Sequence, residues 1–151
     1  MDLKERLLED MKKAMKARES GRERLSLIRM LRAAIKNAEI EKGCDLDDPG
    51  VVEVLAGELK KRKDALEEFR KAGRDDLVKA TEKELEILAE YLPEPLGEEE
   101  IRQMVIALVE EMGATGPKDL GRVMGRVMPQ VRGRADGRVV NRVVREVLAG
   151  E

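Results

Sequence analysis

The residues best suited to chemistry are eight basic side chains in the last third of the chain. They lie in two expected amphipathic helices and around the turn between them: Lys118, Arg122, Arg126, Arg132, Arg134, Arg138, Arg142 and Arg145. From Ala114 to Glu151 these eight stand against four acidic residues, a net charge of +4, whereas residues 93–113 hold one basic residue and six acidic ones, a net of −5. Lysine and arginine spread over adjacent helices can match the spacing of phosphates in a nucleic-acid backbone. The pattern therefore indicates a surface that could bind folded nucleic acid.

Aromatic side chains, which usually stack on the bases of single strands, are nearly absent. The chain has Phe69, Tyr91 and no tryptophan, so residues 98–151 contain no aromatic residue at all. This disfavours sequence-specific reading of single strands and is compatible with recognition of the shape and phosphates of folded RNA. A basic face that only keeps the protein soluble would show the same composition. The residues alone leave both interpretations open.

The groups that most often carry out catalysis are missing. The 151 residues include no histidine, which removes the commonest general base and the commonest metal ligand. There is no glycine-rich phosphate loop and no pair of cysteines two residues apart, and the carboxylates are scattered along amphipathic segments. We therefore expect no catalytic residues, no metal site and no cofactor, and the residues favour a binding module.

The composition predicts a helical, packed protein. Hydrophobic residues make up 42% and charged residues 41% of the chain, the net charge is −2, and prolines number five. A core without many aromatic residues must be built from Leu, Val, Ile, Met and Ala, which suits helix packing. Cys44 is the single cysteine, which excludes an intrachain disulfide. No apolar run is long enough for a signal peptide or a membrane span, so we expect a cytoplasmic protein without a membrane partner.

Hydrophobic periodicity predicts four helices in residues 1–92, arranged as helical hairpins. The first ends near Ser20–Gly21, the second runs from about Arg22 to Glu41, the third begins after a cap at Asp47 or Asp48, and the fourth opens at Asp75 or Asp76. Gly73 is expected just after the end of the third helix. The basic run Lys60–Lys63 lies within that helix and is interpreted as solvated surface rather than a binding epitope.

Two prolines within residues 93–97 mark the predicted boundary between an N-terminal domain, residues 1–92, and a C-terminal domain, residues 98–151. We expect three helices in the second domain, the last capped by Asp136. Gly121 and Gly125, one turn apart, suggest a close approach between helices, and Pro129 should end or kink the middle helix. No strand is expected, so the predicted fold class is all-α.

Three sequence patterns resemble one known family. They are RLSLIRMLRAAIKN at Arg24–Asn37, KKRKDALEEFRKAGR at Lys60–Arg74, and GRVMGRVMPQVRGRADGRVVNRVVREVL at the end of the chain, joined by EYLP at Glu90–Pro93. They resemble the YqeY-like proteins of the GatB/YqeY family, and the resemblance extends over essentially the whole chain. The last pattern also resembles the tail of the B subunit of the tRNA-dependent amidotransferases.

The resemblance implies a helical N-terminal domain followed by a three-helix domain that binds tRNA. It also implies the family label of carbon–nitrogen ligase with glutamine as amido-N-donor, although the chain lacks the amidotransferase's catalytic cradle and we expect no catalysis by the chain on its own. The function expected from it is that of a tRNA-binding accessory module. The alternatives are a subunit or regulator of such a ligase complex, with an amidotransferase or aminoacyl-tRNA synthetase as partner, and a protein–protein scaffold.

Overall fold

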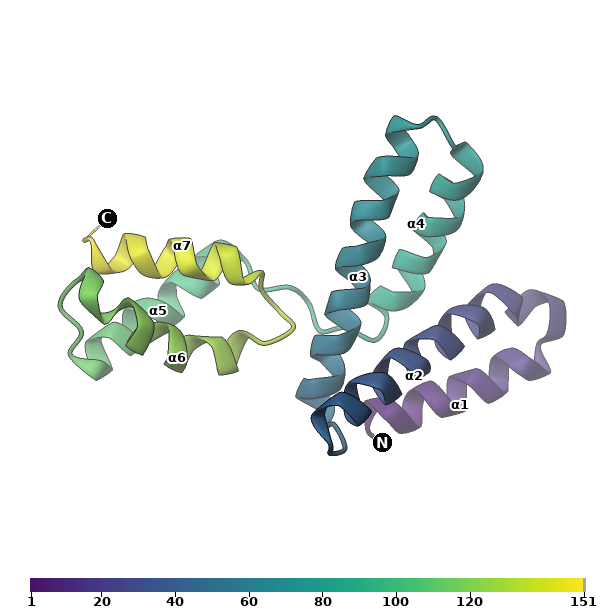
Figure 1. Ribbon diagram of the computed structural model, residues 1–151, viewed down its shortest axis with the longest axis horizontal. Coiled ribbons are helices and arrows are strands. Elements are labelled where there is room, and N and C mark those ends of the chain that lie inside the picture. Colours follow the sequence, from purple (N-terminus) through teal and green to yellow (C-terminus); the bar gives the residue numbers. More distant parts are fainter. Residues whose placement is uncertain (151) are drawn as a thin grey trace. The chain divides into compact units, whose positions relative to one another are not determined.

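The computed structural model describes residues 1–150, and these are helical with no strand (Figure 1). The predicted all-α fold class is confirmed. The described chain divides into two compact units, an N-terminal unit of residues 1–93 and a C-terminal unit beginning at Glu94. The elements, in order, are α1 (Leu3–Lys16), η1 (Arg18–Gly21), α2 (Arg22–Lys42), α3 (Asp48–Lys71), α4 (Asp75–Ala89), α5 (Glu98–Met112), η2 (Pro117–Asp119), α6 (Leu120–Val131) and α7 (Gly137–Leu148).

The N-terminal unit is built from two helical pairs, α1 with α2 and α3 with α4 (Figure 1). Apolar residues from all four helices meet in one core: Leu7, Leu27, Ile28, Leu31, Ile35, Val51, Leu55, Ile87, Leu88 and Tyr91. The link between α1 and α2 is the short 3₁₀ turn η1, which ends at the buried Gly21. A Cβ atom at Gly21 would lie 2.3 Å from the backbone oxygen of Ala14, so only glycine lets the chain turn back this closely.

The ends of α3 follow the local rules that the sequence predicted. The carboxylate of Asp47 accepts a hydrogen bond of 3.0 Å from the amide of Gly50 and so caps the first turn. At the other end Gly73 has a φ of +69°, and the amides of Gly73 and Arg74 donate to the carbonyls of Arg70 and Phe69. This pair of bonds is the glycine-dependent helix stop known as the Schellman motif.

The basic run on α3 is only partly a surface feature. Lys60, Lys61 and Lys63 are exposed, but Arg62 is 8% exposed. The Arg62 guanidinium donates to the carboxylate of Glu58 on its own helix and to that of Glu84 on α4, both at 2.9 Å. The interpretation of the whole run as solvated surface is therefore wrong for Arg62. This arginine faces α4, and one carboxylate from each of the two helices compensates its charge.

The end of α4 is tied to α1 and α2 through Tyr91. The Tyr91 hydroxyl donates to the Asp10 carboxylate, and the Arg6 guanidinium lies over the Tyr91 ring at 4.7 Å from its centroid. The neighbouring Glu90 pairs with Arg24 of α2 at 2.8 Å. These contacts join α1, α2 and the end of α4 just before Pro93.

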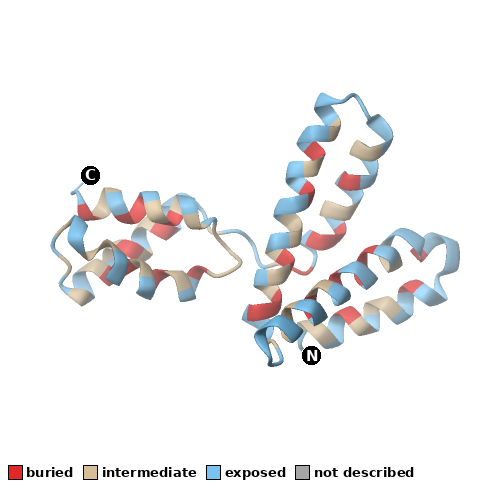
Figure 2. Ribbon diagram, viewed as in Figure 1, coloured by how far each residue is buried: buried red, intermediate tan, exposed pale blue. Residues whose placement is uncertain are grey.

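The C-terminal unit is a three-helix arrangement in which α5, α6 and α7 each pack against the other two. Figure 2 shows buried residues along each of these helices, and ten of them form the core: Ile101, Val105, Leu108, Val123, Val127, Val131, Val140, Val143, Val144 and Leu148. The Asp136 carboxylate accepts a 2.8 Å hydrogen bond from the amide of Arg138, which confirms the predicted cap of α7.

Two details of α6 differ from expectation. A Cβ atom at Gly121 or at Gly125 would have no neighbour within 4 Å, and both residues are exposed, so the predicted close helix approach at these glycines is wrong. Pro129 lies inside α6, which continues to Val131 before it ends. Val123 and Val127 occupy the inward face, because the apolar stripe of α6 and not its glycines packs on the core.

The Tyr91 contacts predict an unusual alkaline titration. Burial and the hydrogen bond to Asp10 raise the pKa of Tyr91 from 10 to about 12, because both disfavour the phenolate. The resulting stability is present below pH 10 and is lost as pH rises from about 10 to about 12. Tyr91 is the only tyrosine, so ultraviolet absorbance reports it directly. We expect a midpoint near 12 in the native protein and near 10 in denaturant, with Asp10→Asn lowering the native value. A titration midpoint near 10 in the native protein would contradict the burial of Tyr91 and its hydrogen bond to Asp10.

Candidate nucleic-acid interface

The eight predicted basic residues lie on three elements of the C-terminal unit and on the turn between two of them. Lys118 is on η2, Arg122 and Arg126 are on α6, and Arg138, Arg142 and Arg145 are on α7. These six are exposed. Arg132 and Arg134 lie between α6 and α7 and are half-buried.

The three arginines of α7 form one stripe, because their spacings of four and three residues return to the same side of a helix. The opposite side of α7 carries the buried residues Val140, Val143, Val144 and Leu148. The core therefore orients the helix so that the arginine stripe faces away from it. This is how the sequence positions the most regular group of cations in the unit.

Arg142, the middle member of the stripe, is held by carboxylates. Its guanidinium pairs with Glu98 at the start of α5 and with Glu146 at 3.2 Å on its own helix. Glu146 also pairs with Arg102 of α5, so four charged side chains connect α5 and α7. The hydrogen bond from Arg102 is the main reason that the pKa of Glu146 lies below its usual range, and Arg142 adds to it. The bond to Glu98 is the main reason that the pKa of Arg142 is raised.

The arginines of α6 make longer ion pairs. Arg122 lies 3.5 Å from an oxygen of Asp119, and Arg126 lies 3.5 Å from an oxygen of Glu111. Asp119 also accepts a 2.9 Å hydrogen bond from the amide of Thr115. That bond is the main cause of the lowered pKa of Asp119, and the charge of Arg122 contributes. Both arginines are half exposed, so these pairs are weak and could exchange for another anion.

The turn between α6 and α7 is tied to the residues before α5. The Nε of Arg134 donates to the carbonyl oxygen of Glu94 at 3.3 Å, and the carbonyl oxygen of Arg134 accepts a 2.8 Å bond from the amide of Leu96. Arg132 is also engaged in an interaction within the chain. Arg134 is therefore partly committed to holding the turn.

Three of the predicted residues form no side-chain ion pair with a carboxylate within residues 1–150, although the charge of Lys118 contributes to the lowered pKa of Asp119. The side chains of Lys118 and Arg138 form no hydrogen bond or ion pair with this part of the chain, and Arg145 donates at 2.6 Å to the neutral amide oxygen of Asn141. Because η2 packs against α7, the cations lie on two contacting elements. We call Lys118, Arg138 and Arg145 the uncompensated cations of the C-terminal unit.

The structure thus divides the eight predicted basic residues by whether they have partners within the chain. It also adds residues to the site that the sequence did not predict. Glu98, Arg102 and Glu146 decide the state of Arg142, yet they were not predicted as part of the site. The spacing of Arg142 and Glu146 by four residues was a readable signal. The pairing of Arg102 with Glu146, 44 residues apart, was not.

Within residues 1–150 no three His, Cys, Asp or Glu side chains are placed to hold a metal ion. No helix in this part of the chain is long and apolar enough to cross a membrane.

Comparison with known proteins shows the family. The family model described as Yqey-like protein matches residues 4–148. The chain belongs to the YqeY-like family. It is 40% identical over 114 residues to "Altered inheritance of mitochondria protein 41, mitochondrial" of Lachancea thermotolerans, a match covering 74% of this chain and 60% of the relative. The protein of the same name in Kluyveromyces lactis is 36% identical over 115 residues, again covering 74% and 60%, and that of Pyrenophora tritici-repentis is 33% identical over 121 residues, covering 79% and 65%.

The names of these relatives bear on the predicted cellular location, and their lengths show how much of each relative this chain matches. All three are named as mitochondrial proteins, and this contradicts the cytoplasmic location predicted from the sequence. The cytoplasmic prediction used only the charged start of the sequence and the lack of long apolar runs, and neither feature specifies a compartment. The chain spans about three fifths of the length of the first two of these relatives.

The charge network between α5 and α7 predicts how the C-terminal unit responds to acid. Since the pKa of Glu146 is lowered in the folded protein, its stabilisation is present above the usual value of 4.5 and is lost as pH falls through the folded-state pKa. The unfolding temperature of the parent protein should therefore drop between pH 6 and pH 3, and Glu146→Gln should make this drop smaller. The unfolding temperature of the C-terminal unit is measured from the amide NMR signals of α7. Glu100→Gln is the control, because the side chain of Glu100 is exposed in the first turn of α5 and forms no hydrogen bond or ion pair within residues 1–150. Equal drops in the Glu146→Gln and parent proteins would contradict the network's role.

Proposed function

We propose that the C-terminal unit binds tRNA through its phosphate backbone and that Lys118, Arg138 and Arg145 make the main contacts. One observation carries this proposal: these three cations are exposed and uncompensated in a unit where the neighbouring arginines have carboxylate or backbone partners. Cations without partners offer a phosphate full attraction, because no internal ion pair has to be broken first.

Local arrangement, not overall charge, must provide the attraction. From Glu94 to Glu151 there are nine basic and ten acidic residues, a net charge of −1. A unit of this charge does not attract RNA through its global field. The acidic residues are concentrated at the start of α5, at its end and in the α5–α7 network. The arginine stripe of α7 remains a locally positive strip.

The choice of tRNA as ligand rests on the type of contact and on the resemblance. The C-terminal unit has no aromatic side chain on which bases could stack, so contacts to phosphates and to RNA shape are the recognition available to it. The end of the chain resembles the tail of the tRNA-dependent amidotransferase B subunit, as noted from the sequence. Folded RNA of the tRNA class is therefore the ligand that both considerations favour.

The proposed role is binding without catalysis. The 151 residues include no histidine, and the pKa shifts in the α5–α7 network favour the charged forms, since the pKa of Glu146 is lowered and that of Arg142 is raised. Neither group is therefore poised to exchange a proton near neutral pH. A catalytic partner of the carbon–nitrogen ligase or aminoacyl-tRNA synthetase class would bring the reactive groups. In that arrangement this chain holds the RNA and the partner acts on it.

The test exchanges two of the uncompensated cations. Arg138→Glu with Arg145→Glu should weaken binding to total tRNA by at least about tenfold at low salt, because two phosphate contacts become repulsive. The loss should be similar for unrelated tRNAs, since phosphate contacts carry little sequence information. Both positions face away from the core, so helicity measured by circular dichroism should not change.

The matched control is Lys60→Glu with Lys63→Glu, the same change of charge at two exposed positions of α3. It should leave tRNA affinity within about twofold of the parent. The proposal fails if the Arg138/Arg145 variant binds as tightly as the parent protein. It also fails if the α3 variant loses as much affinity, because binding would then follow net charge alone.

A further inference from the structure

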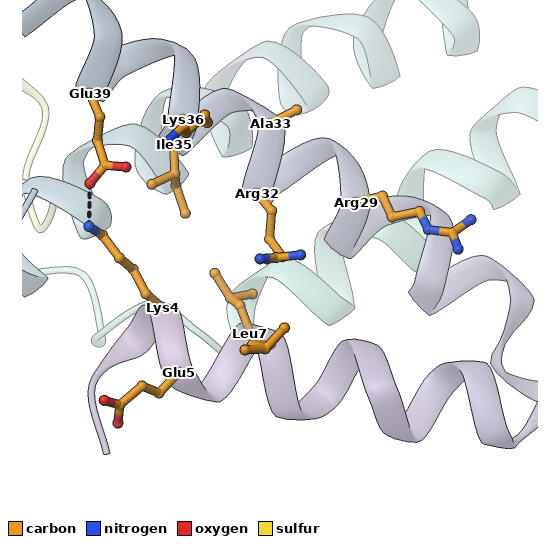
Figure 3. Close-up of a pocket in the computed structure, with 10 residues that line it drawn as sticks. Lys4, Glu5, Leu7, Arg29, Arg32, Ala33, Ile35, Lys36 and Glu39 are labelled. Atoms are coloured by element: carbon orange, nitrogen blue, oxygen red, sulfur yellow. Dashed lines mark hydrogen bonds and ion pairs between the residues drawn. The ribbon is translucent and has the colours of Figure 1, made fainter. Parts of the chain in front are cut away.

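A groove runs between α1 and α2 on the N-terminal unit. It encloses about 550 Å³ and is lined from one side by Lys4, Leu7 and Leu8 of α1 and from the other by Arg29, Arg32 and Lys36 of α2, among others. Figure 3 shows these two walls, with Arg32 reaching from α2 toward α1 above Leu7. The groove belongs to a single hairpin, whose core residues pack inward against α3 and α4.

The groove carries both apolar and basic side chains. Leu7, Leu8, Ala33 and Ile35 contribute its apolar lining, although Leu7 and Ile35 are almost fully buried by the core beneath. Leu8 is half-buried and Ala33 is exposed, so these two offer the accessible apolar surface. An accessible apolar strip between two helices is suited to the side chains of a third helix.

The acidic groups of the groove are already used by the hairpin itself. The Glu39 carboxylate forms an ion pair with the Lys4 ammonium and accepts a 2.8 Å hydrogen bond from the amide of Leu46. These two bonds are the main reasons that the pKa of Glu39 lies below its usual range. Glu5 closes the capping box at the start of α1 with Asp2. The charge of Lys36 makes a smaller contribution to the lowered pKa of Glu39, so Glu39 offsets part of that charge, whereas neither carboxylate pairs with Arg29 or Arg32.

Three cations of the groove form no ion pair with a carboxylate of residues 1–150, and of these only Lys36 has its charge partly offset, by Glu39. Within residues 1–150 the side chains of Arg29 and Lys36 have no hydrogen-bond or ion-pair partner, and Arg32 donates only to the sulfur of Met11 at 3.3 Å. The three follow one another along α2 at spacings of three and four residues and so form a single stripe. Arginines of the same unit that face other helices are paired, as Arg24 is with Glu90 and Arg62 is with Glu84.

We propose that this groove docks an acidic amphipathic helix of a partner protein. The apolar side chains of that helix would cover Leu8 and Ala33, and its carboxylates would pair with Arg29, Arg32 and Lys36. Charge complementarity selects this occupant over a neutral or basic helix. An RNA backbone would use the cations but has nothing to place on the apolar lining. The surface lies on α1 and α2 and is independent of the RNA-binding residues proposed for α7.

The probe is a capped, fluorescently labelled peptide of about 18 residues, long enough to form helix, with leucines on one face and glutamates on the others. Titrated against the full chain, it should bind the parent protein. Arg29→Glu with Lys36→Glu should weaken it by at least about tenfold, because attraction becomes repulsion at two positions. Ala33→Glu leaves all three cations in place and should also weaken it. Amide shifts on binding should centre on Leu8 and Ala33.

Controls separate this surface from the RNA site. The peptide with lysines in place of glutamates should not bind the parent protein, and Lys60→Glu with Lys63→Glu should not alter binding of the acidic peptide. The Arg29/Lys36 variant should retain the parent's affinity for tRNA. The proposal is overturned if the acidic peptide does not bind the parent protein or binds the Arg29/Lys36 variant equally well. It is also overturned if Ala33→Glu has no effect, or if the Arg29/Lys36 variant loses tRNA binding.

Discussion

The compensation of arginine by carboxylate is the constraint on which both the fold and the surfaces of this protein depend. The chain contains 30 basic and 32 acidic residues, so positive charge is plentiful but nearly balanced. Where helices pack, the balance is local: Arg62 meets Glu84 between α3 and α4, and Arg142 meets Glu98 between α7 and α5. A cation in such a contact would leave a carboxylate unpaired if it turned to a ligand, which costs free energy.

This constraint separates structural cations from those available to a partner. Arg138 and Arg145 on α7, and Arg29 and Lys36 on α2, lie on outward stripes where no carboxylate of the described chain forms an ion pair with them. The stripes have different surroundings. The α2 stripe borders a groove with apolar lining, whereas the α7 stripe lies on the face opposite the valine core. Because of this difference in surroundings, we assign a partner helix to the α2 stripe and RNA phosphates to the α7 stripe.

Local features of the fold were predictable from sequence, and long-range pairings were not. The caps at Asp47 and Asp136 and the stop at Gly73 depend on a few neighbouring residues, and the structure confirms them. The burial of Arg62 depends on Glu84, 22 residues away, and no periodicity announces it. The interpretation of Gly121 and Gly125 failed because small residues permit a close approach but do not require one. The sequence named the eight basic residues only as a candidate group, and dividing them by their partners required knowing where each acidic side chain lies.

The salt dependence of tRNA binding tests the central claim most directly, because its slope counts the phosphate contacts made by cations. With three uncompensated cations engaged, the logarithm of the association constant should fall against the logarithm of salt concentration with a slope of about −2 to −3. Participation of all eight basic residues would give a slope of about −6 to −7. A slope in the first range would support the division of the site by carboxylate pairing. A slope in the second range, or binding that does not respond to salt, would contradict it.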